Sequence, residues 1–252
     1  MIKVRNLRIS FNGRPIIENA DFDVPAGSTV VLMGKNGSGK SVILKTIAGL
    51  IPEFTGEISI NGTDIREFYR NREKMSGHRA GEFRLAYVFQ KGGLFDSMNV
   101  YDNVAFGLTR TLIDAKTLHD RVSSSLERVG LAGSEGKLPS ELSGGMQKRA
   151  GLARAICLDP GIILYDDPTA GLDPILSDSI ADLMGEIRDN GRAASLTVTH
   201  DLKVAEKIAD TILLLYGGRI VFSGTGADFF SKKNPFARQF IEGDIDGPID
   251  IL

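Results

Sequence analysis

The chain of 252 residues contains a single cysteine, Cys157, so it has no internal disulfide framework and no metal cluster built on cysteine ligands. Its formal net charge is only −2, which argues against nucleic acid as the main partner. No apolar run approaches the roughly 18 residues that span a bilayer. The first five residues lack an apolar core, so we expect no secretory signal. With 42% hydrophobic and 25% charged residues, the composition is that of a globular protein.

Glycine is abundant, with 29 residues in the chain, and it predicts segments of unusual backbone freedom. Strand and helix signals alternate, and this order predicts an α/β fold with a mostly parallel core sheet. Strands are expected over 2–11, 16–24, 28–33, 56–60, 85–89, 162–165, 195–198 and 211–216. Helices are expected through residue 50, over 100–111 and 116–129, and from near residues 143, 174 and 201.

In the middle of the chain the pattern changes from alternating strands and helices to helices alone. This predicts a helical subdomain over 92–157, inserted into an α/β core of 1–91 and 158–241. Residues 242–252 are acidic and contain Gly-Pro, and we expect an extended C-terminal tail there. The polar stretch 64–84 is predicted as an exposed helix and loop. Its basic side chains either contact anionic headgroups or acidic partner loops, or form a solvated face: Arg66, Arg70, Arg72, Lys74, His78, Arg79 and Arg84.

The run Gly-Lys-Asn-Gly-Ser-Gly-Lys-Ser at 34–41 fits the phosphate-binding pattern G-x-x-x-x-G-K-[ST]. It follows an apolar strand and opens a helix, which is the context that the pattern requires. Its glycines let backbone N–H groups face an anion, Lys40 reaches the β- and γ-phosphates, and Ser41 places its hydroxyl on Mg²⁺. The plainer alternative is a glycine-rich turn before a helix. The residues expected to hold the nucleotide are Gly34, Asn36, Gly37, Ser38, Gly39, Lys40, Ser41 and Val42.

Two further motifs complete the chemistry. Asp166 ends the apolar strand 162–165 and supplies the carboxylate that a phosphate-binding loop of this pattern, a P-loop, needs for its metal ion. Ser143 is expected to cap a helix whose first turn contains Gly144 and Gly145, and such a helix end binds phosphate. Because the P-loop already holds the nucleotide's phosphates, we expect this second cradle to serve the nucleotide of another copy of the chain.

In this order and over nearly the whole chain, these motifs resemble the nucleotide-binding subunits of ATP-binding cassette (ABC) transporters. The resemblance implies a P-loop NTPase of the α/β class, with an antiparallel β subdomain beside the parallel sheet and an inserted helical signature subdomain. It also implies that two copies close two ATP molecules, with Mg²⁺, between the P-loop of one and the signature motif (142–147) of the other, and hydrolyse them. The implied metal-site residues are Ser41, Gln90 and Asp166.

Four other residues take their roles from the resemblance. Phe11 stands where the family stacks an aromatic ring on adenine, and Asp173 belongs to the segment called the D-loop. Gln90 and His200 sense and orient the γ-phosphate. Taken singly, Phe11 is more typical of a core aromatic, His200 of a capping or packed side chain and Gln90 of a surface amide, while Asp173 could be a helix N-cap before Pro174.

The residue after the metal-binding aspartate polarises the attacking water in this family and is usually Glu. Here it is Asp167, which is one methylene shorter. Because a displacement of about 1 Å in a catalytic group can cost on the order of 10²-fold in rate, we expect a slow ATPase, or a loop that shifts to compensate. With Lys40, Gln90 and His200, Asp167 forms the expected catalytic set.

Narrower similarities indicate the branch of the family. Residues 94–105, 167–175 and 238–249 resemble the Mla/Mce-type lipid-transport ATPases, which move phospholipid between the inner membrane and the outer envelope. This implies a second copy of the chain, an integral-membrane permease, an Mce-type lipid-binding protein and a STAS-type regulatory protein as partners. It places the chain, as a peripheral subunit, on the cytoplasmic face of the inner membrane.

The permease is expected to dock near Leu94, Phe95 and Met98, apolar residues of a predicted loop that could equally pack on the helical subdomain. The tail residues Ile249, Ile251 and Leu252 are expected near the second subunit. Three other functions remain open. They are an importer for a small polar solute, a cassette that acts on DNA or ribosomes, and a slow nucleotide-gated subunit in which Asp167 limits hydrolysis.

Overall fold

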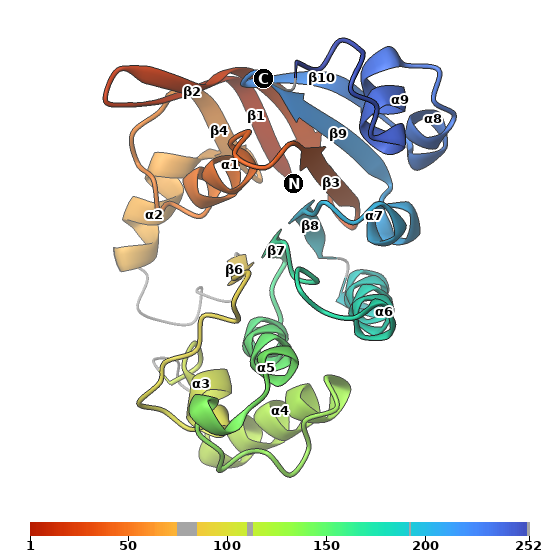
Figure 1. Cartoon of the computed structure of the whole chain (residues 1–252). Coiled ribbons are helices and arrows are strands. Elements are labelled where there is room, and N and C mark those ends of the chain that lie inside the picture. Colours follow the sequence, from red (N-terminus) through yellow and green to blue (C-terminus); the bar gives the residue numbers. More distant parts are fainter. Residues whose placement is uncertain (75–84, 110–112, 192, 251–252) are drawn as a thin grey trace.

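The computed structural model describes residues 1–74, 85–109, 113–191 and 193–250. Within these residues, ten strands form one sheet in the order β5-β4-β1-β2-β10-β9-β3-β8-β7-β6 (Figure 1). The strands are β1 (Ile2–Phe11), β2 (Arg14–Val24), β3 (Thr29–Gly34), β4 (Thr55–Ile60), β5 (Thr63–Asp64), β6 (Leu85–Val88), β7 (Ile162–Asp166), β8 (Ala194–Val198), β9 (Thr211–Tyr216) and β10 (Arg219–Gly224).

One half of the sheet, β9-β3-β8-β7-β6, is parallel. Every residue of β3, β7 and β8 is buried, as expected of continuous apolar runs that are covered on both faces. The other half, β2-β1-β4-β5, is antiparallel, and Asn12 and Gly13, both with positive φ, form the turn between β1 and β2. The halves meet through β10, where Arg219 pairs with Asn19 of β2. The predicted fold class is confirmed.

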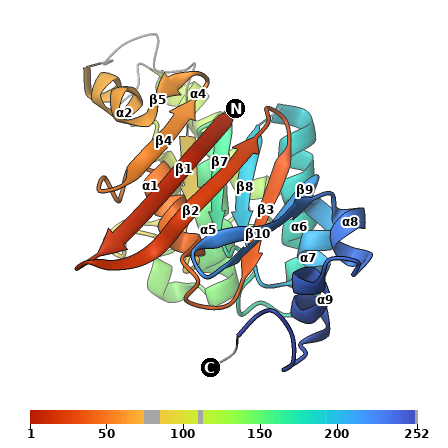
Figure 2. The same cartoon turned by 90° about the horizontal axis from the view of Figure 1, so that it is seen from above.

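The described helices are α1 (Lys40–Ile47), α2 (Ile65–Lys74), α3 (Val100–Ala105), α4 (Ala115–Arg128), α5 (Gly144–Cys157), α6 (Pro174–Gly191), α7 (Leu202–Ile208), α8 (Gly226–Phe230) and α9 (Pro235–Glu242), with a 3-10 turn η1 (Pro139–Glu141). The twisted sheet curves around α1 (Figure 1), and from above β1 and β2 lie over this helix (Figure 2). Its Ile43, Leu44 and Ile47 share one core with strands of both halves. None of the described helices combines the length and hydropathy that a membrane crossing requires.

We use the name helical lobe for α3, η1, α4 and α5, which lie between β6 and β7 in the chain and below the sheet in Figure 1. A second core runs from the lower face of the sheet into this lobe and includes Val31, Val88 and Ile156. Cys157 lies in the same core. Because the apolar cluster is continuous, the helical lobe and the sheet are packed against each other rather than joined by a linker.

Several boundaries differ from the prediction. The first helix ends at Ile47 rather than near residue 50, and Gly49 follows it with φ 73°. The helix expected over 100–111 ends at Ala105. The stretch 64–84 is not wholly exposed, because Ile65 and Phe68 of α2 are buried in the core. Residues 75–84, with His78, Arg79 and Arg84, lie outside the described residues.

The C-terminal region is the largest difference. Strand β10 and helices α8 and α9 were not expected from the sequence. The tail after α9 is not extended, because it folds back onto its own chain. Ile249 is only 9% exposed, and its backbone N–H and C=O both bond the side chain of Gln239 in α9. Ile249 therefore packs within its own chain, and its expected proximity to a second subunit stays a prediction; Ile251 and Leu252 fall outside the described residues.

Candidate nucleotide site

The glycine-rich loop joins β3 to α1 through backbone conformations that require glycine. A Cβ on Gly34 (φ 149°) would lie 2.4 Å from the carbonyl oxygen of Leu215, and one on Gly39 (φ 101°) would lie 2.7 Å from the side chain of Ile17. Gly37 also has positive φ, 79°. The sequence therefore fixes a tight loop that delivers the chain directly into the N-terminus of α1.

Lys40, the first residue of α1, is buried, and its Nζ donates to the carbonyl oxygens of Gly34 (2.8 Å) and Lys35 (2.9 Å). Burial lowers the pKa of Lys40 below its usual value, and the nearby negative charges of Asp167 and Asp166 offset part of this effect. The hydroxyl of Ser38 is buried without a hydrogen-bond partner among the described residues. A cation and an unpaired hydroxyl in a loop of this shape fit a bound phosphate.

The end of β7 lies against the first turn of α1. Ser41 Oγ donates to Asp166 Oδ1 at 2.6 Å, and the hydroxyl of Tyr87, from β6, donates to Asp166 Oδ2 at 2.8 Å. A carboxylate and a hydroxyl are hard oxygen ligands of the kind that Mg²⁺ prefers, so these residues fit the metal. Gln90 lies in an exposed turn after β6 and makes no described hydrogen bond to Ser41 or Asp166.

Asp167 and His200, from neighbouring strand ends, meet at this edge of the sheet. His200 Nδ1 lies 2.8 Å from Asp167 Oδ2, while Asp167 Oδ1 is buried with no partner among the described residues. The backbone of Asp167 is left-handed (φ 51°), a conformation that aspartate tolerates better than most residues, and its N–H donates to the carbonyl of Val198 at 2.9 Å. An oriented, buried carboxylate with one free oxygen is suited to accept a proton from water.

A hollow of about 510 Å³ lies beside the glycine-rich loop, between β2 and the β9–β10 turn. Its lining includes Arg14, Ile16, Gly37, Ser38 and Gly218. Phe11 is 40% exposed at the end of β1 and does not line this hollow, although its ladder partner Arg14 does. The packed-aromatic alternative for Phe11 is therefore wrong.

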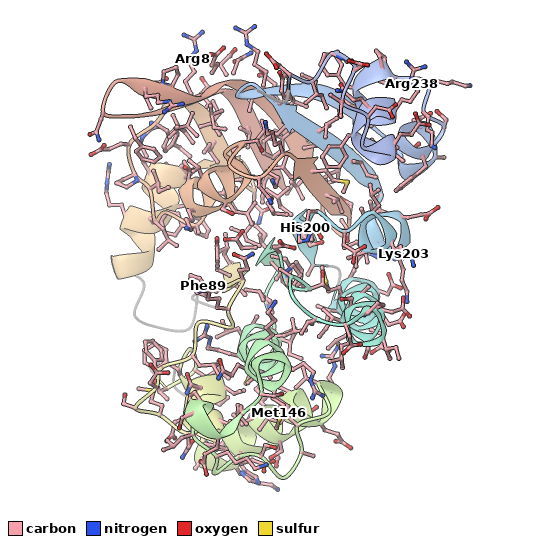
Figure 3. The ribbon with its side chains drawn as sticks, in the orientation of Figure 1. Arg8, Phe89, Met146, His200, Lys203 and Arg238 are labelled. Carbon is pink, nitrogen blue, oxygen red and sulfur yellow. The ribbon has the colours of Figure 1, made fainter. Side chains whose placement is uncertain are left out.

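The second cradle has the local structure predicted for it. Ser143 Oγ accepts a hydrogen bond from the N–H of Met146 at 3.3 Å, and a Cβ on Gly144 would meet no described atom within 4 Å. The N-terminus of α5 is therefore open. It belongs to the helical lobe, where Figure 3 labels Met146, whereas His200 lies at the edge of the sheet. Within one chain the two cradles do not face one phosphate.

Residues 17–170 match the family model described as ABC transporter, which covers more than half of the chain. This chain belongs to the ABC transporter ATP-binding family. It is 41% identical over 251 residues to the probable ribonucleotide transport ATP-binding protein mkl of Mycobacterium leprae, covering 98% of this chain and 70% of that one. It is 37% identical over 250 residues to the intermembrane phospholipid transport system ATP-binding protein MlaF of Escherichia coli K12, covering 99% and 91%.

Another relative and a solved structure support the same family assignment. Protein TRIGALACTOSYLDIACYLGLYCEROL 3, chloroplastic, of Arabidopsis thaliana is 39% identical over 266 residues, covering 99% of this chain and 75% of that one. The dimeric structure of MJ0796, a bacterial ABC transporter cassette, matches with a TM-score of 0.79 and 27% identity, covering 90% of this chain and 99% of that chain. This ABC cassette is thus an ATP hydrolase subunit of a transporter.

The D-loop of this ABC cassette leads directly into α6. Asp173 Oδ1 accepts hydrogen bonds from the N–H groups of Ile175 and Leu176, both at 3.0 Å, so it caps the helix with Pro174 in the first position. The N-cap alternative for Asp173 is therefore confirmed. Lys148 of α5 donates to the carbonyl of Ala170, which ties the helical lobe to this loop.

The loop expected to dock the permease is partly packed on the chain's own core and partly exposed. Leu94 is half-buried against the helical lobe, whereas Phe95 is exposed, with its ring 4.6 Å from that of Phe106. Two residues that sequence reasoning missed hold this loop. The buried side chain of Asn103 bonds the backbone of Phe95 at both its N–H and its carbonyl, and Arg154 of α5 donates to the carbonyls of residues 92 and 93. Asn103 lies within the segment 94–105 that carries the lipid-transport resemblance and Arg154 lies in no motif, but neither pattern indicates this role.

Proposed function

We propose that two copies of this chain form the ATP-driven motor of a phospholipid transporter. The observation that supports the site is the convergence of Ser41, Asp166, Asp167 and His200 beside the loop that holds Lys40. The similarity to MlaF, which extends over 91% of that protein, supports the phospholipid cargo.

Each site residue has a role that its surroundings support. Lys40 exchanges the carbonyl oxygens of its own loop for the β- and γ-phosphates, and Ser38 donates to a phosphate oxygen. Ser41 and Asp166 would hold the Mg²⁺, which would neutralise phosphate charge. Asp167 orients the attacking water through its free Oδ1, and His200 fixes the carboxylate by its contact with Oδ2.

Other roles rest on the family resemblance and on position. Phe11, exposed beside the hollow, stacks on adenine, and Gln90 would contact the metal ion and sense the γ-phosphate. The cradle of the partner copy, from Ser143 to Gly145, closes on the same ATP molecule. Asp173 contributes to that interface in addition to capping α6. An open helix N-terminus, remote from the P-loop of its own chain, supports this head-to-tail pairing.

The cassette would sit on the cytoplasmic face of the inner membrane, where the exposed Phe95, with Leu94 and Met98 beside it, receives a permease helix. Partners of the Mce and STAS types belong to this proposal as well. Arg66 stacks at 4.1 Å on the ring of Phe54, and this contact favours a structural role for at least that member of the basic stretch.

A second candidate cargo is a small polar solute, because the mycobacterial relatives are named as probable ribonucleotide transport proteins. Affinity purification of the tagged chain from its native membranes, with identification of the proteins and lipids that accompany it, decides between the two. A permease with an Mce-type protein and bound phospholipid is the expected result. A periplasmic solute receptor in their place would refute the lipid proposal and leave the ATPase assignment standing.

A further inference from the structure

The carboxylate of Asp166 is held at both of its oxygens, and only one of the two partners belongs to a recognised motif. Ser41 occupies Oδ1 from the P-loop side. Oδ2 accepts from the hydroxyl of Tyr87 at 2.8 Å. Tyr87 is absent from the set of residues that the sequence identified, so its position requires an explanation of its own.

The strand register places Tyr87 beside Asp166. Tyr87 of β6 pairs with Leu164 of β7, and Asp166 lies two residues further on the same face of β7. A tyrosine is long enough to reach such a diagonal neighbour. Its ring packs against the core around α1 and lies 4.5 Å from the ring of Phe89, so the hydroxyl is presented by a fixed side chain.

The chemistry of this contact is that of a donor to a charged acceptor. A phenolic hydroxyl carries its proton at neutral pH, so the Tyr87 hydroxyl donates a hydrogen bond to the carboxylate. Such a bond restricts rotation of the carboxylate and leaves Oδ1, next to Ser41, as the oxygen that is directed toward the first turn of α1.

We propose that Tyr87 is a positioning residue for Mg²⁺. Its hydrogen bond sets the orientation of the Asp166 carboxylate, which forms the proposed metal site together with Ser41. This inference rests on the proposed metal site. Residues that hold metal-binding carboxylates from behind typically contribute 10- to 100-fold to metal affinity. The contribution should be larger for Mg²⁺, which demands near-ideal octahedral geometry, than for Ca²⁺, whose coordination is more flexible.

The test measures binding of a non-hydrolysable ATP analogue to the full chain by calorimetry, in EDTA, in MgCl₂ and in CaCl₂. Tyr87→Phe removes one oxygen and keeps the ring packed on Phe89. Tyr69→Phe is the matched control, because the hydroxyl of Tyr69 also donates at 2.8 Å, to the carbonyl of Ile47, and its ring packs against the same core. Thermal melting shows that each variant is folded.

For Tyr87→Phe we expect about 10-fold weaker binding in MgCl₂, a smaller loss in CaCl₂ and no change in EDTA. Tyr69→Phe should match the parent in all three. Equal losses in Mg²⁺, Ca²⁺ and EDTA would assign Tyr87 a purely structural role and overturn the inference, as would an unchanged Mg²⁺ response. A third variant, Asp166→Asn, distinguishes failure of the Tyr87 inference from failure of the proposed metal site. If Asp166→Asn also leaves the Mg²⁺ response unchanged, the metal site itself is wrong.

Discussion

Lengthening the catalytic carboxylate by one methylene, with Asp167→Glu, should raise the rate of ATP hydrolysis and lower the stability of the fold. The added carbon moves the carboxyl group by up to about 1.5 Å from the backbone. Asp167 Oδ2 is engaged by His200 and Oδ1 has no partner in the described part of the chain, so the extension carries Oδ1 further into the site. A positional gain of about 1 Å corresponds to as much as 10²-fold in rate, or about 2.7 kcal/mol of barrier.

The stability loss comes from the backbone. At φ 51°, a residue longer than aspartate or asparagine costs roughly 1–2 kcal/mol, because its side chain cannot relieve the left-handed conformation by local hydrogen bonding. The N–H of Asp167 is bonded to Val198 and its carbonyl to the N–H of Ala170, so the backbone cannot easily relax. For a chain of this size the cost corresponds to a fall in Tm of about 2–8 °C.

The assay is phosphate release at saturating Mg²⁺ and ATP, at protein concentrations high enough for dimers, with Tm measured on the same samples. Asp167→Asn is the control, since asparagine has the same length and tolerates positive φ. It should keep the parent's Tm and lose 10²- to 10⁴-fold in rate, the usual contribution of a general base. A folded Asp167→Glu variant that is no faster than the parent would refute the argument that the short side chain limits turnover.

Three further predictions follow from other parts of the chain. Lys40→Ala should abolish hydrolysis, because it removes the cation of the phosphate loop; substantial residual turnover in the phosphate-release assay would contradict the assigned site. Gly151→Ala should destabilise the fold by about 1–3 kcal/mol in urea titrations, because its Cβ would lie 2.5 Å from the carbonyl oxygen of Gly92. Gly185→Ala, in open space within α6, should instead stabilise by about 0.4–1 kcal/mol, and equal effects at both positions would contradict the packing argument. Gln239→Ala leaves the buried N–H of Ile249 unpaired, so we expect a loss of about 1–3 kcal/mol and faster proteolysis of the tail, whereas parent-like proteolysis would show that the tail is held elsewhere.

The parts of the site that the sequence predicted are those in which local pattern and strand order act together. The glycine-rich loop is recognisable because the backbone at positions 34 and 39 excludes a Cβ. Asp166 meets Ser41 because a buried parallel strand ends where the helix after β3 begins, and such strand ends share one edge of the sheet. Fully buried strands such as β3 and β7 can also be predicted from the sequence, since their apolar runs have no polar face.

Tyr87 and Asn103 could not be predicted in this way. Each bonds residues that are near in space through strand register or a loop fold, and no local pattern marks either one. Strand β10 differs, because a signal for it was present. Gly217 and Gly218, both with positive φ, form the turn between β9 and β10, and such a glycine pair is typical of a hairpin. Helix α9 likewise begins at the cap Asn234 with Pro235 and ends at Gly243.

The C-terminal tail shows how composition can mislead. Acidic residues with Gly-Pro predict an extended segment, because their backbone polar groups have no strand or helix partners. Here the side chain of Gln239 supplies several of those partners, and the hydroxyl of Tyr216 accepts from the N–H of Asp250. Gln239, itself buried in α9, donates through Nε2 to the carbonyls of Asp244 and Ile249 and accepts at Oε1 from the N–H of Ile249. With its backbone satisfied in this way, the tail can bury Ile249 in its own chain, although the composition of the segment contains no sign of that contact.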